Sequence, residues 1–139
     1  MQRTFAVIKP DAVAAGYQGK IIAAIQESGL RVVALETLHL SEAQAKGFYH
    51  VHAERPFFGD LVKFMTEGPI VAMVLEGDNA IKRWRDLMGP TNAAEAPKDT
   101  LRGQFGTNIE RNATHGSDAE DTAAFEIGYF FSGRALAGL

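Results

Sequence analysis

A histidine flanked by small and polar residues is the feature of this chain best suited to chemistry. His115 lies within residues 112–118, which read NATHGSD. An imidazole titrates near neutral pH, so it can serve as a nucleophile or as an acid-base group. Gly116, next in the chain, can adopt a positive φ or let a ligand approach the backbone closely. The segment therefore predicts a histidine that meets an anion.

A helix is predicted directly after this histidine. Ser117 and Glu120 have the S-x-x-E spacing of a capping box, which predicts Ser117 as the N-cap of a helix that continues through Phe130. His115 would then lie two residues outside the helix start, where backbone N–H groups and the helix dipole attract phosphate. At about 100° per residue, one apolar stripe of the helix contains Ala119, Ala123, Glu126 and Phe130.

The position of Glu126 on that inward stripe requires a partner for its carboxylate. Two partners are compatible with the residues alone. One is an ordinary structural hydrogen bond. The other is the imidazole of His115, whose tautomer the carboxylate would fix so that the second ring nitrogen is left to react.

Length and composition predict one soluble globular domain over residues 1–139. The chain is 46% hydrophobic and 22% charged, as is typical of such domains. No apolar run approaches the roughly 20 residues of a membrane span, and the N-terminus lacks a signal-peptide core. We therefore expect no membrane association and a cytoplasmic location.

The absence of cysteine excludes disulfides, thiolate metal sites and cysteine nucleophiles. Any covalent chemistry must therefore use a nucleophile other than cysteine.

The net charge of -3 argues against a general nucleic-acid-binding surface, although it leaves room for a local cationic pocket.

Strand and helix patterns alternate along the chain and predict an α+β fold. Apolar residues typical of strands occupy residues 3–9, 31–40 and 70–75, and helical spacing occupies residues 18–27, 41–55, 59–65 and 79–88. Ser41 and Gln44 form a capping box, and Asp78 or Asn79 can cap the helix whose inward residues are Ile81, Trp84 and Met88.

The second half of the chain includes a long stretch without periodicity, residues 89–108, which we expect to be a loop that is either functional or disordered. Residues 132–139 are expected to form a tail. The element order, β-α-β-α-α-β-α-loop-β-α, contains the split β-α-β of a ferredoxin-like α/β sandwich. We therefore expect an antiparallel sheet covered by helices.

Several short motifs in a fixed order resemble those of nucleoside diphosphate kinases. They are Lys9-Pro10-Asp11, Arg55-Pro56-Phe57-Phe58, Gly68-Pro69, Leu75-Glu76-Gly77, Gly89-Pro90-Thr91-Asn92, Leu101-Arg102-Gly103 and residues 112–118. The resemblance covers nearly the whole chain. It implies a ferredoxin-like fold and transfer of the γ-phosphoryl group from a nucleoside triphosphate to a nucleoside diphosphate by a ping-pong reaction through a phosphohistidine.

The resemblance also implies roles for individual residues. His115 would be the nucleophile, Glu126 would orient it, and Tyr49 and Ser117 would lie close to it. Matches to nucleotide-binding positions of the family are Lys9, Phe57, Arg85, Thr91, Arg102 and Asn112. Because the family stacks the base on the aromatic ring that corresponds to Phe57, and every base has a π face, low base specificity is expected.

The family further implies Mg²⁺, held mainly by the nucleotide's phosphate oxygens, and we assign no protein ligand to it. Nucleoside tri- and diphosphates are the implied partners, and a homo-oligomer, hexamer or tetramer, is the implied assembly. The chain departs from the family mainly in the long loop, where Ala93 replaces a common proline and Asp99 a common glycine.

Two other functions are compared with these residues. Residues 16–21 lack the glycine spacing and the Ser/Thr after lysine that a P-loop kinase needs. A non-catalytic ferredoxin-like module that binds nucleotide, RNA or protein is the remaining alternative, although the aromatic RNA-stacking signature is missing.

Overall fold

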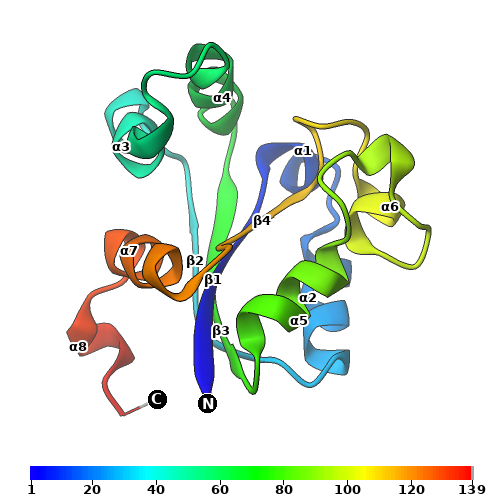
Figure 1. Cartoon of the computed structure of the whole chain (residues 1–139), viewed down its shortest axis with the longest axis vertical. Helices are drawn as coiled ribbons and strands as arrows, with labels where there is room; N and C mark the ends of the chain where they lie inside the picture. Colours follow the sequence, from blue (N-terminus) through cyan, green and yellow to red (C-terminus); the bar gives the residue numbers. More distant parts are fainter. Residues whose placement is uncertain (139) are drawn as a thin grey trace.

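The computed structural model describes residues 1–138, and within them four strands form one sheet (Figure 1). The strands are β1 (Gln2–Ile8), β2 (Arg31–Leu38), β3 (Ile70–Gly77) and β4 (Thr114–Gly116). Their order is β2-β3-β1-β4, and each neighbouring pair is antiparallel. This arrangement confirms the predicted ferredoxin-like fold. Leu139, the last residue of the expected tail and domain, lies outside the described residues.

Both faces of the sheet are covered, because successive side chains of β1 point to opposite sides. Ala6 and Ile8 belong to a core with α1 (Pro10–Ala14), α2 (Gln18–Glu27) and α5 (Ala80–Met88). Phe5 and Val7 belong to a second core with α3 (Glu42–Phe48), α4 (Phe58–Met65) and α7 (Glu120–Phe130). Figure 1 shows these two groups of helices on opposite sides of the strands.

Several local predictions are confirmed. Helix α2 has the predicted bounds, and the chain leaves it through Gly29 at a φ of 91°. The Ser41 hydroxyl accepts a hydrogen bond from the Gln44 N–H, and the Gln44 side chain accepts one from the Ser41 N–H, which completes the capping box. The inward residues of α5 are buried as predicted.

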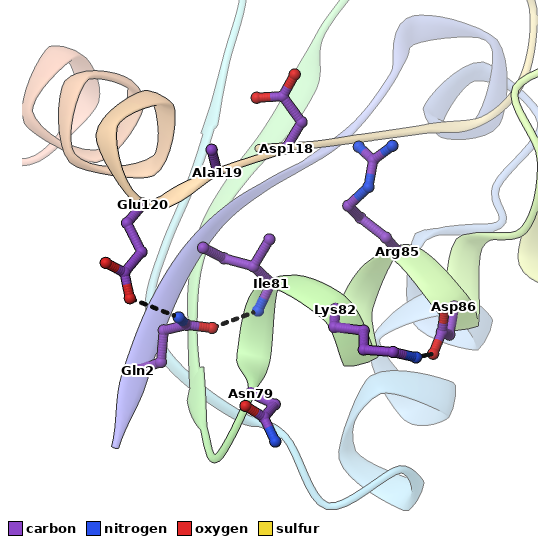
Figure 2. Close-up of a pocket in the computed structure, with 9 residues that line it drawn as sticks. All are labelled: Gln2, Asn79, Ile81, Lys82, Arg85, Asp86, Asp118, Ala119 and Glu120. Carbon is purple, nitrogen blue, oxygen red and sulfur yellow. Dashed lines mark hydrogen bonds and ion pairs between the residues drawn. The ribbon is translucent and has the colours of Figure 1, made fainter.

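The predicted cap of α5 is wrong in its chemistry. Asn79 occupies the N-cap position, but it has a φ of 52° and its side chain makes no capping hydrogen bond. Instead, the side-chain oxygen of Gln2 accepts a hydrogen bond from the Ile81 N–H at 2.9 Å (Figure 2). A residue distant in sequence thus accepts a hydrogen bond from the first turn of this helix. The local spacing of residues did not indicate this contact.

The stretch predicted as a loop, residues 89–108, contains two short helices, η2 (Ala93–Glu95) and α6 (Leu101–Phe105). The Thr100 hydroxyl caps α6 by accepting a hydrogen bond from the Gly103 N–H at 3.1 Å. Helices of one turn are too short to produce a detectable periodicity. Ala93, where the family commonly has proline, is buried.

Two further boundaries differ from prediction. The helix expected up to residue 55 ends at Phe48 and is followed by the short 3-10 helix η1 (His50–His52). The expected tail contains α8 (Gly133–Leu136), because the Ser132 hydroxyl accepts a hydrogen bond from the Ala135 N–H. None of the helices in residues 1–138 combines the length and the apolar character that crossing a membrane requires.

Candidate active site

His115 lies in the edge strand β4, where it pairs with Val7 of β1. The prediction that it precedes a helix start by two residues is therefore wrong, as is the prediction that Ser117 caps that helix. Helix α7 begins at Glu120 with Ala119 as its N-cap. The reason is that Ser117 remains with the sheet, where its N–H donates to the Phe5 carbonyl at 3.3 Å.

One carboxylate oxygen of Glu126 contacts both His115 and Ser117, as the predicted grouping of these residues requires. Glu126 Oε1 lies 3.0 Å from His115 Nε2 and accepts a hydrogen bond from the Ser117 hydroxyl at 2.7 Å. The carboxylate faces inward as predicted, with 15% of its side chain exposed. Since a carboxylate accepts, Nε2 carries the hydrogen and the lone pair of the neutral ring lies on Nδ1.

Aromatic rings hold the imidazole from the side of the second core. The ring centroids of Phe48 and Tyr49 lie 5.7 Å and 6.3 Å from that of His115, both in edge-to-face orientation. The buried Tyr49 hydroxyl has no hydrogen-bond partner within residues 1–138. Burial, and then the charge of Glu126, raise the pKa of Tyr49, so its hydroxyl keeps its proton and can donate.

A strained turn leads into β4. The Thr114 N–H donates to the Asn112 carbonyl at 2.8 Å across Ala113, whose φ is 71°. A three-residue turn with a positive φ at its centre is rare for a residue that has a Cβ. The Asp11 carboxylate accepts a hydrogen bond from the Ala113 N–H at 3.1 Å and so helps to hold the turn.

Trp84 holds the backbone of the histidine itself. Its indole N–H donates to the His115 carbonyl at 3.2 Å from the buried face of α5. The ring packs so closely against Gly116 that a Cβ there would lie 2.6 Å from it. The sequence predicted Trp84 as a core residue. Its hydrogen bond with His115 could not be predicted, because the two residues come together only in the folded sheet.

Two cations, the partly buried Arg102 and the buried Lys9, lie near each other beside this part of the sheet. Arg102 donates to the carbonyls of Gly89 and Thr114 at 2.9 Å and 3.0 Å, while its Nε has no partner in the described part of the chain. Burial, with the nearby positive charge of Arg85, lowers the pKa of Arg102 to about 10. Arg102 thus contacts Thr114, the residue before His115, and lies close enough to Arg85 for the two positive charges to interact.

Lys9 is the second of these cations, and it is buried. It is 8% exposed, and its ammonium donates to Asn112 Oδ1 at 2.8 Å. Burial, with the charge of Arg102, lowers the pKa of Lys9 to about 8. The Asn112 amide in turn donates to the carbonyls of Thr91 and Ile109 at 3.0 Å and 2.9 Å. Asn112 therefore joins the lysine to the long loop.

A cleft of about 380 Å³ opens beside Lys9. Its lining consists of Lys9, Phe57, Leu61, Thr91, Ile109 and Glu110. Three of the predicted nucleotide-binding residues, Lys9, Phe57 and Thr91, therefore share one cavity. Sequence reasoning missed Leu61 and Ile109, which line its apolar part and have no signal beyond their apolar character.

A second depression lies between α5 and the start of α7 (Figure 2). Gln2 crosses it, since its amide donates to Glu120 at 3.1 Å and its oxygen accepts from the Ile81 N–H. Figure 2 shows the exposed Arg85 guanidinium directed away from Gln2, on the side where Asp118 lies. Carboxylates of Asp86, Asp118 and Glu120 make this depression less suited to a polyphosphate than the cleft beside Lys9.

Within residues 1–138, no three His, Cys, Asp or Glu side chains are grouped so that they could hold a metal ion. The cation placed nearest to His115 by a printed contact is Arg102, which donates to the carbonyl of the preceding residue, Thr114.

An antiparallel ferredoxin-like sheet that presents a carboxylate-bound histidine near Lys9 and Arg102 is suited to phosphoryl transfer. The profile of the family "Nucleoside diphosphate kinase" matches residues 2–136, so the chain belongs to the nucleoside diphosphate kinase family. It is 62% identical to the enzyme of Syntrophotalea carbinolica over 136 residues, which is 98% of this chain and 99% of that one. It is 58% identical to that of Oleidesulfovibrio alaskensis over 137 residues, 99% of each chain.

Solved structures agree with this assignment. The nucleoside diphosphate kinase of Aquifex aeolicus superposes with a TM-score of 0.94 at 42% identity, and the match covers 98% of this chain and 99% of that one. The enzyme of Halobacterium salinarum, solved in complex with CDP, gives a TM-score of 0.94 at 39% identity over 99% and 92% of the two chains.

These relationships make the protein an enzyme that transfers phosphoryl groups from nucleoside triphosphates. The alternative of a non-catalytic ferredoxin-like module is not favoured, because relatives at 52% to 62% identity over nearly the full length are kinases of this family. A nucleotide-binding kinase is also consistent with a requirement for a divalent metal.

Proposed function

We propose that Nδ1 of His115 carries the phosphoryl group between two nucleotides that bind in turn. The support is the contact of Nε2 with Glu126, since it leaves Nδ1 as the nitrogen with an available lone pair. In the first half-reaction this lone pair forms a P–N bond with the γ-phosphorus while the bond to the β-phosphate oxygen breaks. The nucleoside diphosphate leaves, and a terminal oxygen of the next diphosphate reverses the step.

The neighbouring residues have supporting roles in this proposal. Ser117 and Glu126 fix the ring, and the protonated Tyr49 hydroxyl donates to a phosphoryl oxygen. Lys9, Arg85 and Arg102 balance the charge of the phosphates, which is the main requirement of phosphoryl transfer. Thr91 and Asn112 complete the contacts with the phosphates and the ribose.

The nucleoside would occupy the cleft beside Lys9, with its base against Phe57. Phe57 is 49% exposed and lines the cleft, so its ring is available as a stacking surface. Stacking accepts any base, and the proposed enzyme therefore has low base specificity. Its partners are nucleoside tri- and diphosphates.

Mg²⁺ is the proposed metal, held by phosphate oxygens with no protein ligand assigned. It would neutralise part of the charge on the transferring phosphate. Lys9 and Arg102 would supply further positive charge beside the phosphates, which fits a nucleotide that carries its own metal.

At the level of the whole protein, we propose that residues 1–139 act as one domain in a cytoplasmic homo-oligomer of four or six chains. The family match over residues 2–136 supports the single domain. Sedimentation velocity tests the assembly against the chain mass of 15.1 kDa, and a monomer would contradict it.

A pulse-chase experiment tests the proposed function. Brief exposure to a γ-labelled nucleoside triphosphate and Mg²⁺ without acceptor should give an acid-labile, base-stable phosphoprotein, and added diphosphate should remove the label. The variant His115→Ala should take up no label. His39→Ala is the matched control, since the exposed His39 contacts the Thr66 carbonyl and should leave labelling unchanged. Normal labelling of His115→Ala would refute the proposal.

A further inference from the structure

An exposed ion pair bridges two segments that both line the proposed nucleotide cleft. One segment is α4 with the residue before it, which supplies Phe57 and Leu61 to the cleft. The other is the turn that supplies Ile109 and Glu110. The distance between these segments determines how much room a nucleoside has.

The turn is internally rigid. Asn108 Oδ1 accepts hydrogen bonds from the N–H groups of Glu110 and Arg111 at 3.0 Å and 2.9 Å. The Thr107 N–H donates to the Arg111 carbonyl at 2.6 Å. The Asn112 amide also donates to the Ile109 carbonyl, so these hydrogen bonds join the residues of the turn into one unit.

Arg111 joins this turn to the end of α4. Its two terminal nitrogens donate to the two carboxylate oxygens of Glu67 at 3.3 Å and 2.8 Å, a bidentate geometry. Its guanidinium carbon also lies 5.0 Å from the ring centre of Phe64, a buried residue of α4. In residues 1–138 no other ion pair links α4 and the residues just after it to the turn.

Phe64 ties this contact to the cleft. The ammonium of Lys9, which lines the cleft, lies 5.9 Å from the centre of the same ring. Glu110, next to Arg111, lines both the cleft and the shallow pocket that Glu67 and Arg111 share. The ion pair therefore lies directly behind the cleft wall.

We propose that Glu67 and Arg111 are positioning residues that clamp the two walls of the nucleotide cleft at the separation a nucleoside requires. The inference rests on the proposed function of the cleft. Breaking the clamp should weaken nucleotide binding and leave the chemistry at His115 unchanged. An exposed ion pair is weak, so the expected increase in KM is about two- to five-fold, at constant kcat.

The sign of the effect at Glu67 separates this proposal from simple electrostatics. If the charges acted on the phosphates alone, removing the negative charge in Glu67→Gln would lower KM. A clamp predicts the opposite, that Glu67→Gln and Arg111→Gln both raise KM. The charge exchange Glu67→Arg with Arg111→Glu should return KM to within about two-fold of the wild type, because the pair is restored in reverse.

The experiment compares steady-state phosphoryl exchange by the wild type, the two single variants and the double variant. Glu42→Gln and Lys46→Gln are the matched controls, since they remove one charge each from an exposed pair on α3 outside the cleft. About 0.5 M salt should shrink the difference between the wild type and Glu67→Gln by screening the pair. Circular dichroism verifies the fold of each variant.

An unchanged or lowered KM in Glu67→Gln, or no recovery in the double variant, would overturn the clamp. If the wild type exchanges phosphate but the clamp variants do not behave as expected, the clamp is wrong and the proposed function still stands. A wild type that exchanges no phosphate contradicts the proposed function itself.

Discussion

At the residue scale, Glu126 Oε1 determines which nitrogen of His115 is available. The same oxygen receives the Ser117 hydroxyl, so the carboxylate is held on two sides. The inward position of Glu126 was predicted from helical spacing, because a carboxylate on an apolar stripe needs a partner. The identity of that partner stayed open in the sequence, since it depends on how β4 is placed against α7.

Lys9 gives a prediction for pH dependence at this scale. Burial lowers its pKa to about 8, so Lys9 loses its charge as the pH rises through that value, and nucleotide phosphates lose a partner. The value of kcat/KM should therefore fall above about pH 8. A pH profile of phosphoryl exchange measures this fall.

The variant Lys9→Arg is the control for this profile, because arginine keeps its charge over the same range. Its kcat/KM, whatever its absolute value, should not show the decline near pH 8. An unchanged decline in Lys9→Arg would assign the decline to another group.

The effect of Lys9 on stability has the opposite pH dependence. Between about pH 8 and 10.5 the unfolded chain binds more protons at Lys9 than the folded protein does. The contribution of Lys9 to the unfolding free energy therefore rises with pH over this range.

At the element scale, β4 is held by contacts from α5 and α6 as well as by its pairing with β1. Trp84 of α5 binds the His115 carbonyl, and Arg102 of α6 binds the Thr114 carbonyl. A strand of three residues makes few hydrogen bonds with its neighbouring strand. The hydrogen bonds from these two side chains therefore add to those that hold β4 in place. The backbone on which the proposed nucleophile lies is thus held by side chains of two helices.

Substitution of Gly116 tests the packing of Trp84 against this strand. A Cβ at Gly116 would lie 2.6 Å from the indole and 2.7 Å from Met88, so one of them must move. Gly116→Ala should lower the unfolding free energy by about 1–3 kcal/mol and reduce kcat as the indole leaves the His115 carbonyl. Thermal unfolding and steady-state kinetics measure the two effects.

Gly128→Ala is the matched control for this substitution. Gly128 lies within α7, and a Cβ there meets nothing within 4 Å. Alanine at this position should be neutral or stabilise the protein by up to about 1 kcal/mol. Equal losses of stability in the two variants would show that the contact with Trp84 has no special role.

Helices and strands with a clear period were predictable, whereas short elements were not. Helix α2 and strand β3 follow their apolar patterns because each buries a continuous surface. The helices η2, α6 and α8 have between three and five residues and depend on single capping side chains such as those of Thr100 and Ser132. The Ser117 cap failed because the pairing of β4 with β1, a contact between distant residues, decided the conformation.

At the scale of the whole molecule, one sheet separates two cores and brings the site together at β1 and β4. Lys9 follows β1, His115 lies in β4, and Glu126 reaches the histidine from α7. The topology was predictable from the element order. The cleft was predictable only in part, because Phe57 and Thr91 reach it from segments far apart in sequence.

The position of the phosphate on the imidazole tests the central claim most directly. Nuclear magnetic resonance of the phosphorylated protein, labelled with ¹⁵N in its histidines, identifies the nitrogen that is bonded to phosphorus. The account predicts the phosphate on Nδ1 of His115, since Glu126 holds Nε2. A phosphate on Nε2, or on any other residue, would contradict it.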